Sequence, residues 1–140
     1  MSSLDTLIKL HRWQLDEQRR RVAEFETLAE RLRAQLRRLD REEEEEQDIA
    51  THSHEAAYAY GGYAETVIER RAKLTRSVEE TEAQITQARG ALADAYAEVK
   101  RYEIAAANRL LAKHRGLERL RQQELDEVAI GGFRRKEKFE

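Results

Sequence analysis

Few residues in this 140-residue chain could carry out chemistry, and they are widely scattered. His52 and His54 are separated by one residue and could bind a metal ion. The chain has no cysteine, however, and no carboxylate stands at a characteristic spacing from the two histidines. A pair of histidines alone falls short of the three or four ligands that a zinc site uses. We therefore expect a polar turn here, with no metal site and no cofactor.

Charged runs are the next candidates for binding. Residues 42–46 are five consecutive glutamates, which usually form a solvated surface rather than a cation site. The basic clusters at 19–21 and 134–136 could contact phosphate, but acidic neighbours balance them and the isoelectric point is near 6.2. This balance predicts that the protein has no nucleic-acid partner.

The composition indicates which elements must position these residues. The chain has no proline, 39% charged residues and only 6% aromatic residues. Because proline is the strongest helix breaker, its absence favours long uninterrupted helices. The low aromatic content argues against a broad globular core.

Apolar residues recur in two series with a heptad period. In residues 4–39, nine of the eleven positions are apolar, and His11 and Gln18 are the two polar exceptions. Such a sustained repeat predicts a coiled-coil seam, in which buried polar residues usually set the register. The positions are Leu4, Ile8, His11, Leu15, Gln18, Val22, Phe25, Ala29, Leu32, Leu36 and Leu39.

The second series is weaker because several of its members are alanine, but its register is unbroken from residue 60 to residue 106. Its positions are Tyr60, Ala64, Val67, Arg71, Leu74, Val78, Thr81, Ile85, Ala88, Leu92, Ala95, Val99, Tyr102 and Ala106. Between the two series, Gly61 and Gly62 form the strongest breaker in the first 115 residues.

These features predict an all-α fold in which two long helices form an antiparallel αα-hairpin coiled coil. We expect a single domain over residues 1–140, with a helix over about 3–50, a turn within 51–63 and a longer helix over about 63–130. Ser2 and Asp5 form a capping box for the first helix. Gly131 and Gly132 are expected to end the second helix and to leave a basic tail over 131–140.

The unequal helix lengths predict a surface for another protein. In an antiparallel pair, the first helix is long enough to cover the second only as far as about residue 108. The heptad register of the second helix also changes there. Beyond that point an apolar stripe has no partner within the chain, and exposed apolar stripes tend to mark interaction sites. The expected partner-binding residues there are Leu110, Leu117, Leu120, Arg121, Leu125 and Val128.

Leu10 and Trp13 form a second candidate surface on the first helix. They are three residues apart, on the side that faces away from the seam. Trp13 either lies over the aliphatic stems of neighbouring side chains or anchors a partner, a role in which tryptophan is enriched. We include both residues among the expected partner-binding residues.

No feature of the sequence favours an enzyme. There is no P-loop, glycine-rich phosphate cradle or nucleophile motif, and a two-stranded coiled coil offers no concave interior for a substrate. No run of 18 or more apolar residues is present, and the first residues do not read as a secretory signal. We therefore expect a non-enzymatic cytoplasmic protein.

Three segments of the chain resemble the FliJ family of flagellar export proteins. They are LIKLHRWQLDEQRRRVAE at residues 7–24, ARGAL at 88–92 leading to VKRYE at 99–103, and QQELDEVA at 122–129 followed by a short basic tail. The resemblance covers nearly the whole chain. The tyrosine- and histidine-rich turn departs from the family pattern.

This resemblance implies a coiled-coil stalk component of the type III export apparatus, similar to the central stalk of rotary ATPases. Its implied partners are the hexameric export ATPase FliI and the export gate protein FlhA, with FliH and export chaperones as further candidates. It would lie in the cytoplasm, at the inner membrane through these partners only.

The alternative is a chaperone-like or scaffold hairpin that binds clients along its side and has no ATPase partner. Side-binding would require apolar residues outside the seam along the whole length. In the sequence they concentrate near the chain termini, which favours docking by one end.

Overall fold

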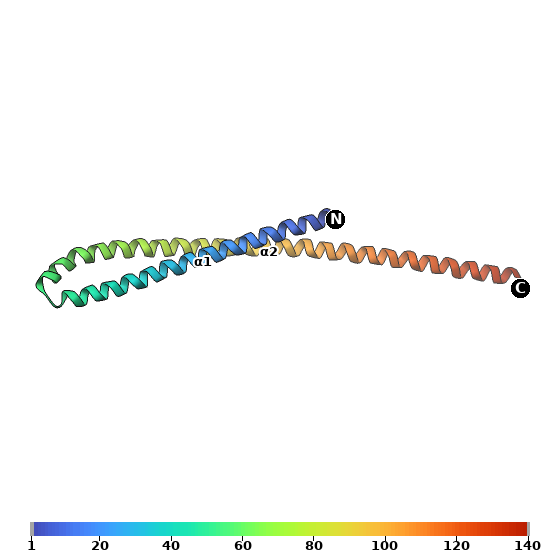
Figure 1. Ribbon diagram of the computed structural model, residues 1–140. Helices are drawn as coiled ribbons and strands as arrows, with labels where there is room; N and C mark the ends of the chain where they lie inside the picture. The colour runs from blue at the N-terminus through green and yellow to red at the C-terminus, as the bar shows by residue number, and fades with distance from the viewer. Residues whose placement is uncertain (1, 140) are drawn as a thin grey trace. The chain divides into compact units, whose positions relative to one another are not determined.

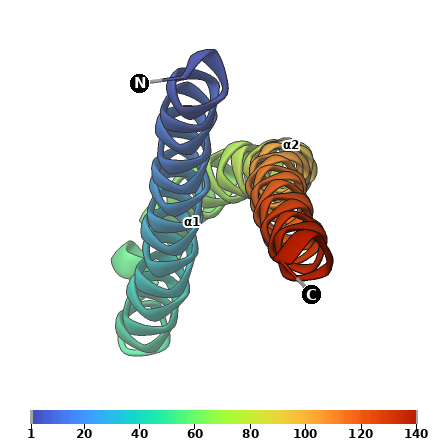
Figure 2. The same cartoon turned by 90° about the vertical axis from the view of Figure 1, so that its right-hand side faces the viewer.

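The protein is a helical hairpin whose second helix is the longer one. The computed structural model describes residues 2–139, and the side chains of residues 2–137. Helix α1 spans Ser3–Ala50 and helix α2 spans His54–Phe139, with 48 and 86 residues respectively. Residues 2–139 contain no other element, as Figures 1 and 2 show. The predicted all-α fold is confirmed.

The chain divides into two compact units. Unit 1 comprises Met1–Arg12 together with Ala97–Glu140, and unit 2 is the continuous stretch Trp13–Tyr96. Each unit therefore contains part of α1 and part of α2. The expectation of a single domain over residues 1–140 stays a prediction, and Met1 and Glu140 lie outside the described residues.

In unit 2 the two helices pack antiparallel through the predicted seam. Ion pairs on its flanks join Glu26 to Arg89 at 2.8 Å and Arg33 to Glu82 at 2.8 Å, so positions rise along α1 as they fall along α2. The core between them consists of small and branched side chains, as expected where two helices approach closely. Its buried members are Leu15, Val22, Ala29, Leu39, Val67, Thr81, Ile85 and Ala88.

In unit 1 the first turns of α1 pack against α2. Ile8 and Val99 are buried, and the rings of His11 and Tyr102 stack with centroids 4.6 Å apart. Arg12 pairs with Glu103 at 3.2 Å beside them. The polar His11 is thus accommodated by an aromatic neighbour.

The heptad prediction is confirmed position by position. Every member of the two series, from Leu4 to Leu39 and from Tyr60 to Ala106, is buried or half-buried. Gln18 is the one described side chain whose buried polar atom, Oε1, has no hydrogen-bond partner.

The start of α1 follows the predicted capping box. The Ser2 hydroxyl accepts a hydrogen bond from the Asp5 N–H at 3.2 Å, and the Asp5 carboxylate accepts one from the Ser2 N–H at 3.4 Å. Two N–H groups at the helix start are satisfied in this way.

The turn is much shorter than the range within which it was expected. It occupies residues 51–53, and α2 begins at His54 rather than at about residue 63. Ser53 provides the cap, because its hydroxyl accepts a hydrogen bond from the Ala56 N–H at 3.0 Å, and Glu55 lies in the first turn. Gly61 and Gly62 lie inside the helix.

The predicted end of α2 is also wrong. The helix continues through Gly131 and Gly132 to Phe139, so the expected basic tail is helical over 131–139. Neither glycine has a positive φ, the conformation with which glycine usually ends a helix. Glu140, the last residue of that tail, lies outside the described residues.

Candidate partner-binding surface

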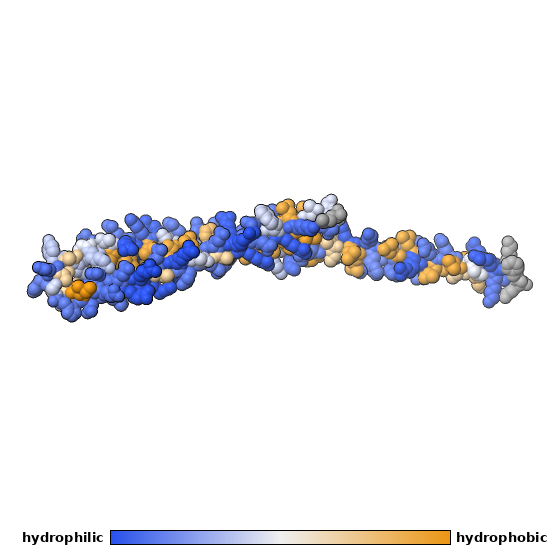
Figure 3. Space-filling view, in the orientation of Figure 1, coloured by the Kyte–Doolittle hydropathy of each residue, from blue (hydrophilic) through white to orange (hydrophobic). Residues whose placement is uncertain are grey.

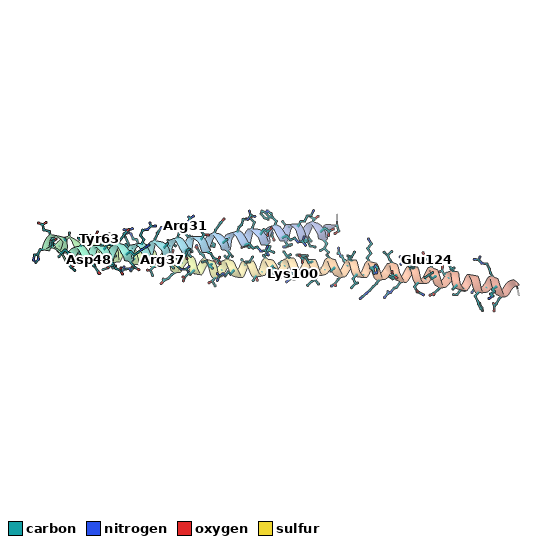
Figure 4. The ribbon with its side chains drawn as sticks, turned by 60° about the horizontal axis from the view of Figure 1, so that its bottom comes forward. Arg31, Arg37, Asp48, Tyr63, Lys100 and Glu124 are labelled. Atoms are coloured by element: carbon teal, nitrogen blue, oxygen red, sulfur yellow. The ribbon has the colours of Figure 1, made fainter. Side chains whose placement is uncertain are left out.

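The most exposed part of the molecule is the C-terminal part of α2, which lies in unit 1. Ala106 is the last half-buried seam position, and every residue from 107 to 137 is exposed except Gly131. We call residues 107–137 the uncovered segment. In Figure 1 this orange-to-red part of α2 has no second helix beside it. Glu124, labelled in Figure 4, lies within it.

The apolar stripe expected on this segment is present and exposed. Its apolar members reach solvent, interleaved with charged residues, as the orange patches in Figure 3 show. Their exposed fractions are 71% for Leu110, 55% for Leu117, 57% for Leu120, 58% for Leu125 and 72% for Val128. Large apolar side chains on a monomeric surface are usually exposed singly, and larger exposed apolar patches are typical of interaction sites.

Arg121, the charged member of the expected site, is exposed within this stripe. Its guanidinium pairs with Glu118 on the preceding turn at 3.4 Å. An exposed pair of this kind contributes little to stability. Arg121 is therefore available to contact a partner at low cost.

Leu10 and Trp13 face solvent, as predicted. Leu10 belongs to unit 1 and is 48% exposed, whereas Trp13 belongs to unit 2 and is 59% exposed. An indole exposed to this extent loses the apolar contacts that normally stabilise it.

Sequence patterns missed several exposed apolar residues of unit 1, because they lie off the seam face. Ile104 and Leu111 are seven residues apart, about two helical turns, and so lie on one side of α2. Ile130 and Phe133 form a second exposed pair, three residues apart. These side chains widen the apolar surface beyond the stripe.

Exposed apolar residues are not confined to the terminal regions, as the sequence had suggested. Leu28, Ile49, Tyr58, Ile68 and Tyr96 of unit 2 are also exposed. Eight large apolar side chains are exposed within the uncovered segment, however, against six over the much longer Trp13–Tyr96. The density still favours binding through the uncovered segment over binding along the side.

The turn that carries His52 and His54 serves to cap the helices. The His52 Nδ1 donates to the carbonyl oxygen of Asp48 at 2.6 Å, and the Thr51 hydroxyl donates to the same oxygen at 2.7 Å. The same carbonyl also accepts a hydrogen bond from the Thr51 N–H at 3.3 Å, so these contacts close the last turn of α1. Among the described residues, no cluster of three or more histidine, cysteine or acidic side chains is arranged to hold a metal ion.

The acidic run near the turn makes an ion-pair network within unit 2. Glu43 and Asp40 both bind the Arg71 guanidinium, which occupies a seam position, and the Asp40 contact is 2.6 Å. These hydrogen bonds raise the pKa of Arg71 above its ordinary value, the Glu43 bond first. Part of the acidic run thus holds the seam together.

Tyr63, at the same end of unit 2, experiences this negative field. Burial is the larger cause of its raised pKa, and the carboxylates of Glu42, Glu46 and Glu43 add to it. Figure 4 labels Tyr63 on α2 and Asp48 on α1 near the turn, and Arg31 and Arg37 farther along α1. A tyrosine with a raised pKa stays protonated, so this site offers no phenolate base.

In unit 1, Glu103 accepts hydrogen bonds from Arg12 and Lys100. These bonds lower the pKa of Glu103, with the Arg12 bond as the first cause. A lowered carboxyl pKa stabilises the folded state above the unfolded pKa and is lost on acidification. The ion pair therefore favours the folded seam at neutral pH.

A shallow concave feature of unit 2, of about 170 Å³, is lined by residues of both helices and includes Gln18, whose buried Oε1 has no hydrogen-bond partner. Its remaining lining residues are Arg21, Phe25, Gln84, Gln87, Ala88 and Ala91. No acid–base pair or nucleophile stands among them.

A family comparison agrees with this geometry. The family model described as "Flagellar FliJ protein" matches residues 1–138, which is almost the whole chain. The chain belongs to the FliJ family. No curated protein and no solved structure matches it.

Membership of the FliJ family makes this chain a component of the flagellar protein export machinery, in a family of structural, non-catalytic members. Within residues 2–139, neither helix of this FliJ-family chain is apolar enough over a sufficient length to cross a bilayer.

Proposed function

We propose that this FliJ-family chain is a non-enzymatic, stalk-like component that binds and stimulates the ring of the export ATPase FliI. The observation that carries the proposal is the uncovered segment, where the seam face of α2 continues after α1 no longer covers it. A helix with such a face gains free energy by inserting it into an apolar groove of a partner.

The apolar anchors of the stripe would supply most of the binding free energy. Interface energy is usually concentrated in a few central residues, and Leu117 and Leu120 lie in the middle of the stripe. Charges at the rim mostly steer the encounter, a role we assign to Arg121 and the basic residues 134–136. Leu10 and Trp13 are proposed as further contacts.

The same role implies a link between the ATPase and the export gate protein FlhA. FliH and export chaperones are further proposed partners, and nucleic acid is not one. The protein would work in the cytoplasm, at the face of the inner membrane, and would reach that membrane only through the export apparatus.

The test is stimulation of purified FliI by the full-length chain and by the variant L117S/L120S/L125S. Because each anchor contributes on the order of 1–2 kcal/mol, we expect the triple variant to lose about 100-fold or more in affinity for the ATPase. Circular dichroism should show that the paired seams remain intact, since the three leucines are exposed and belong to neither heptad series.

The matched control replaces three exposed apolar residues of unit 2, in the variant L28S/I68S/Y96S, which should stimulate the ATPase like the unchanged chain. Replacing the basic residues 134–136 by alanine should slow association more than it weakens the complex. Full stimulation by the L117S/L120S/L125S variant would contradict the proposal and make the acidic end of unit 2, residues 42–63, the leading docking candidate.

A further inference from the structure

We infer that the uncovered segment also pairs antiparallel with the same segment of a second copy of this chain, over residues 107–131. The inference goes beyond the proposed function and does not depend on it. It rests on the apolar positions, the charges and the limits of the segment, all of which lie in unit 1.

The apolar stripe can pack against the same stripe of a second copy that runs in the opposite direction. Leu110 and Val128 are separated by five turns of about 3.6 residues and therefore lie on the same side of α2. Leu117 and Leu120 lie around the midpoint between them. Antiparallel pairing about this midpoint places Leu110 opposite Val128 of the second copy, and Leu117 within one residue of Leu120 of the second copy. Each contact then occurs twice, as a twofold interface requires.

The charges of the segment favour the antiparallel orientation. Residues 109–121 carry five basic side chains and one acidic one, whereas residues 122–130 carry three acidic side chains and no basic one. Antiparallel pairing brings the basic stretch of each copy opposite the acidic stretch of the other. Parallel pairing would bring like charges together, and flanking charges of this kind determine orientation in coiled coils.

The charges nearest the stripe select the same register as the leucines. Arg109 and Glu127 are also five turns apart, and Lys113 and Glu124 are about three turns apart, so each pair shares a side of the helix. Their midpoints, at residue 118 and between residues 118 and 119, lie within one residue of the Leu110–Val128 midpoint at residue 119. In that register Arg109 faces Glu127 of the second copy, and Lys113 faces Glu124 of the second copy.

Within the part of the chain that it describes, the structure gives no intramolecular ion pair to these four charged side chains. Among the described residues, none of them takes part in an ion pair, although Arg121 and Glu118 beside them do. Where α1 covers α2, by contrast, ion pairs flank the seam, such as Arg12 with Glu103 in unit 1. A second copy would supply the pairs that α1 supplies elsewhere.

The first and last residues of the uncovered segment also fit pairing with a second copy. In the proposed register Gly131 of the second copy comes opposite Ala106, the last position that α1 covers. Beyond that point the second helix would meet the first turn of α1. Gly131 and Gly132 are two adjacent weak helix formers, at which the segment can end or turn aside. The paired stretch is about three and a half heptads long, within the range of stable seams.

Sedimentation of the full-length chain tests the pairing. We expect a concentration-dependent shift from the 16.4 kDa monomer to a species of twice that mass. The variants R109E/K113E and E124K/E127K should each self-associate at least tenfold more weakly, because like charges then face each other. An equimolar mixture of the two should pair like the unchanged chain, and so should the quadruple variant R109E/K113E/E124K/E127K.

Cysteine cross-linking tests the orientation, since the chain has no cysteine of its own. A mixture of L110C and V128C should form a disulfide between copies, and so should a mixture of L117C and L120C, whereas L110C should not form one with itself. Self-cross-linking of L110C would indicate parallel pairing and would overturn the inference.

A chain that stays monomeric up to about 100 μM would also overturn it, because pairing weaker than that gains less than about 5–6 kcal/mol. If that monomer still stimulated FliI through the stripe, the proposed function would stand while this inference fell. If R109E/K113E and E124K/E127K self-associated as tightly as the unchanged chain, the proposed register would likewise be contradicted.

Discussion

At the scale of single residues, burial in the seam separates side chains that the composition alone would treat alike. Leu39 and Leu28 both lie on the part of α1 that belongs to unit 2, yet Leu39 is 2% exposed and Leu28 is 41% exposed. The difference follows from the heptad positions, since Leu39 belongs to the first series and Leu28 does not.

Replacing Leu39 by alanine should therefore lower the free energy of unfolding by about 2–4 kcal/mol, because it removes buried methyl groups and leaves a cavity. The matched change L28A should cost less than about 1 kcal/mol. Urea denaturation followed by circular dichroism measures both. Equal losses in the two variants would show that the seam is not packed as described.

The sequence identified the polar residues of the seam but not the residues that they contact. His11 was expected to affect register, and the structure adds its stacking on Tyr102 in unit 1. Arg71 is joined to Asp40 and Glu43 in unit 2. Such pairings depend on residues distant in the sequence, so periodicity could not identify them.

At the scale of helices, α2 shows how length and packing absorb local breakers. Gly61 and Gly62 lie inside the helix between Tyr60 and Tyr63, whose rings are 6.1 Å apart. Neither glycine has a positive φ, and a methyl group added to either would meet no atom within 4 Å. Nothing in the structure requires glycine at these two positions.

The double variant G61A/G62A should therefore be more stable by about 1–2 kcal/mol, because alanine has the higher helix propensity and restricts the unfolded chain. The reverse change at a nearby exposed position, A59G, should lower stability by up to about 1 kcal/mol. Thermal unfolding monitored at 222 nm compares them. Destabilisation by G61A/G62A would mean that the helix requires glycine at these positions, for example as a hinge, rather than merely accommodating it.

The uncovered segment of α2 differs from the paired part of the same helix in lacking a partner rather than in its pattern. Its leucines and charges have the arrangement of a seam, and both proposed occupants, the export ATPase and a second copy, would bury the same residues. One helix face can hold only one of them at a time, so self-pairing would compete with ATPase binding.

At the scale of the whole molecule, charge is nearly balanced. The 28 acidic and 26 basic lysine and arginine residues leave a formal net charge of −2. Many of the arginines are paired with carboxylates, as Arg33 is with Glu82 in unit 2 and Arg12 with Glu103 in unit 1. Such arginines are poorly placed to neutralise phosphates.

We therefore predict no tight binding to duplex or single-stranded nucleic acid at physiological salt, because affinity for phosphate depends on unpaired basic groups. Fluorescence anisotropy with labelled oligonucleotides provides the measurement. Submicromolar binding that is lost steeply as salt rises would contradict the prediction. A basic helical DNA-binding protein serves as the positive control.

The sequence by itself determined the helical class, both seams, the cap at Ser2 and the exposed stripe beyond residue 106. These follow from a periodicity repeated over many turns, so each buried position adds to the same signal. Family membership agrees with them across residues 1–138.

Only the tertiary structure decided where the helices begin and end near glycine. The Ser53 cap and a glycine in a helix each change the free energy by about 1 kcal/mol, so propensity alone could not choose between them. The packing of α2 against α1 in unit 2 settles the choice at Gly61 and Gly62. The ion pairs across the seam were equally out of reach, because they join residues that come together only when the two helices pack.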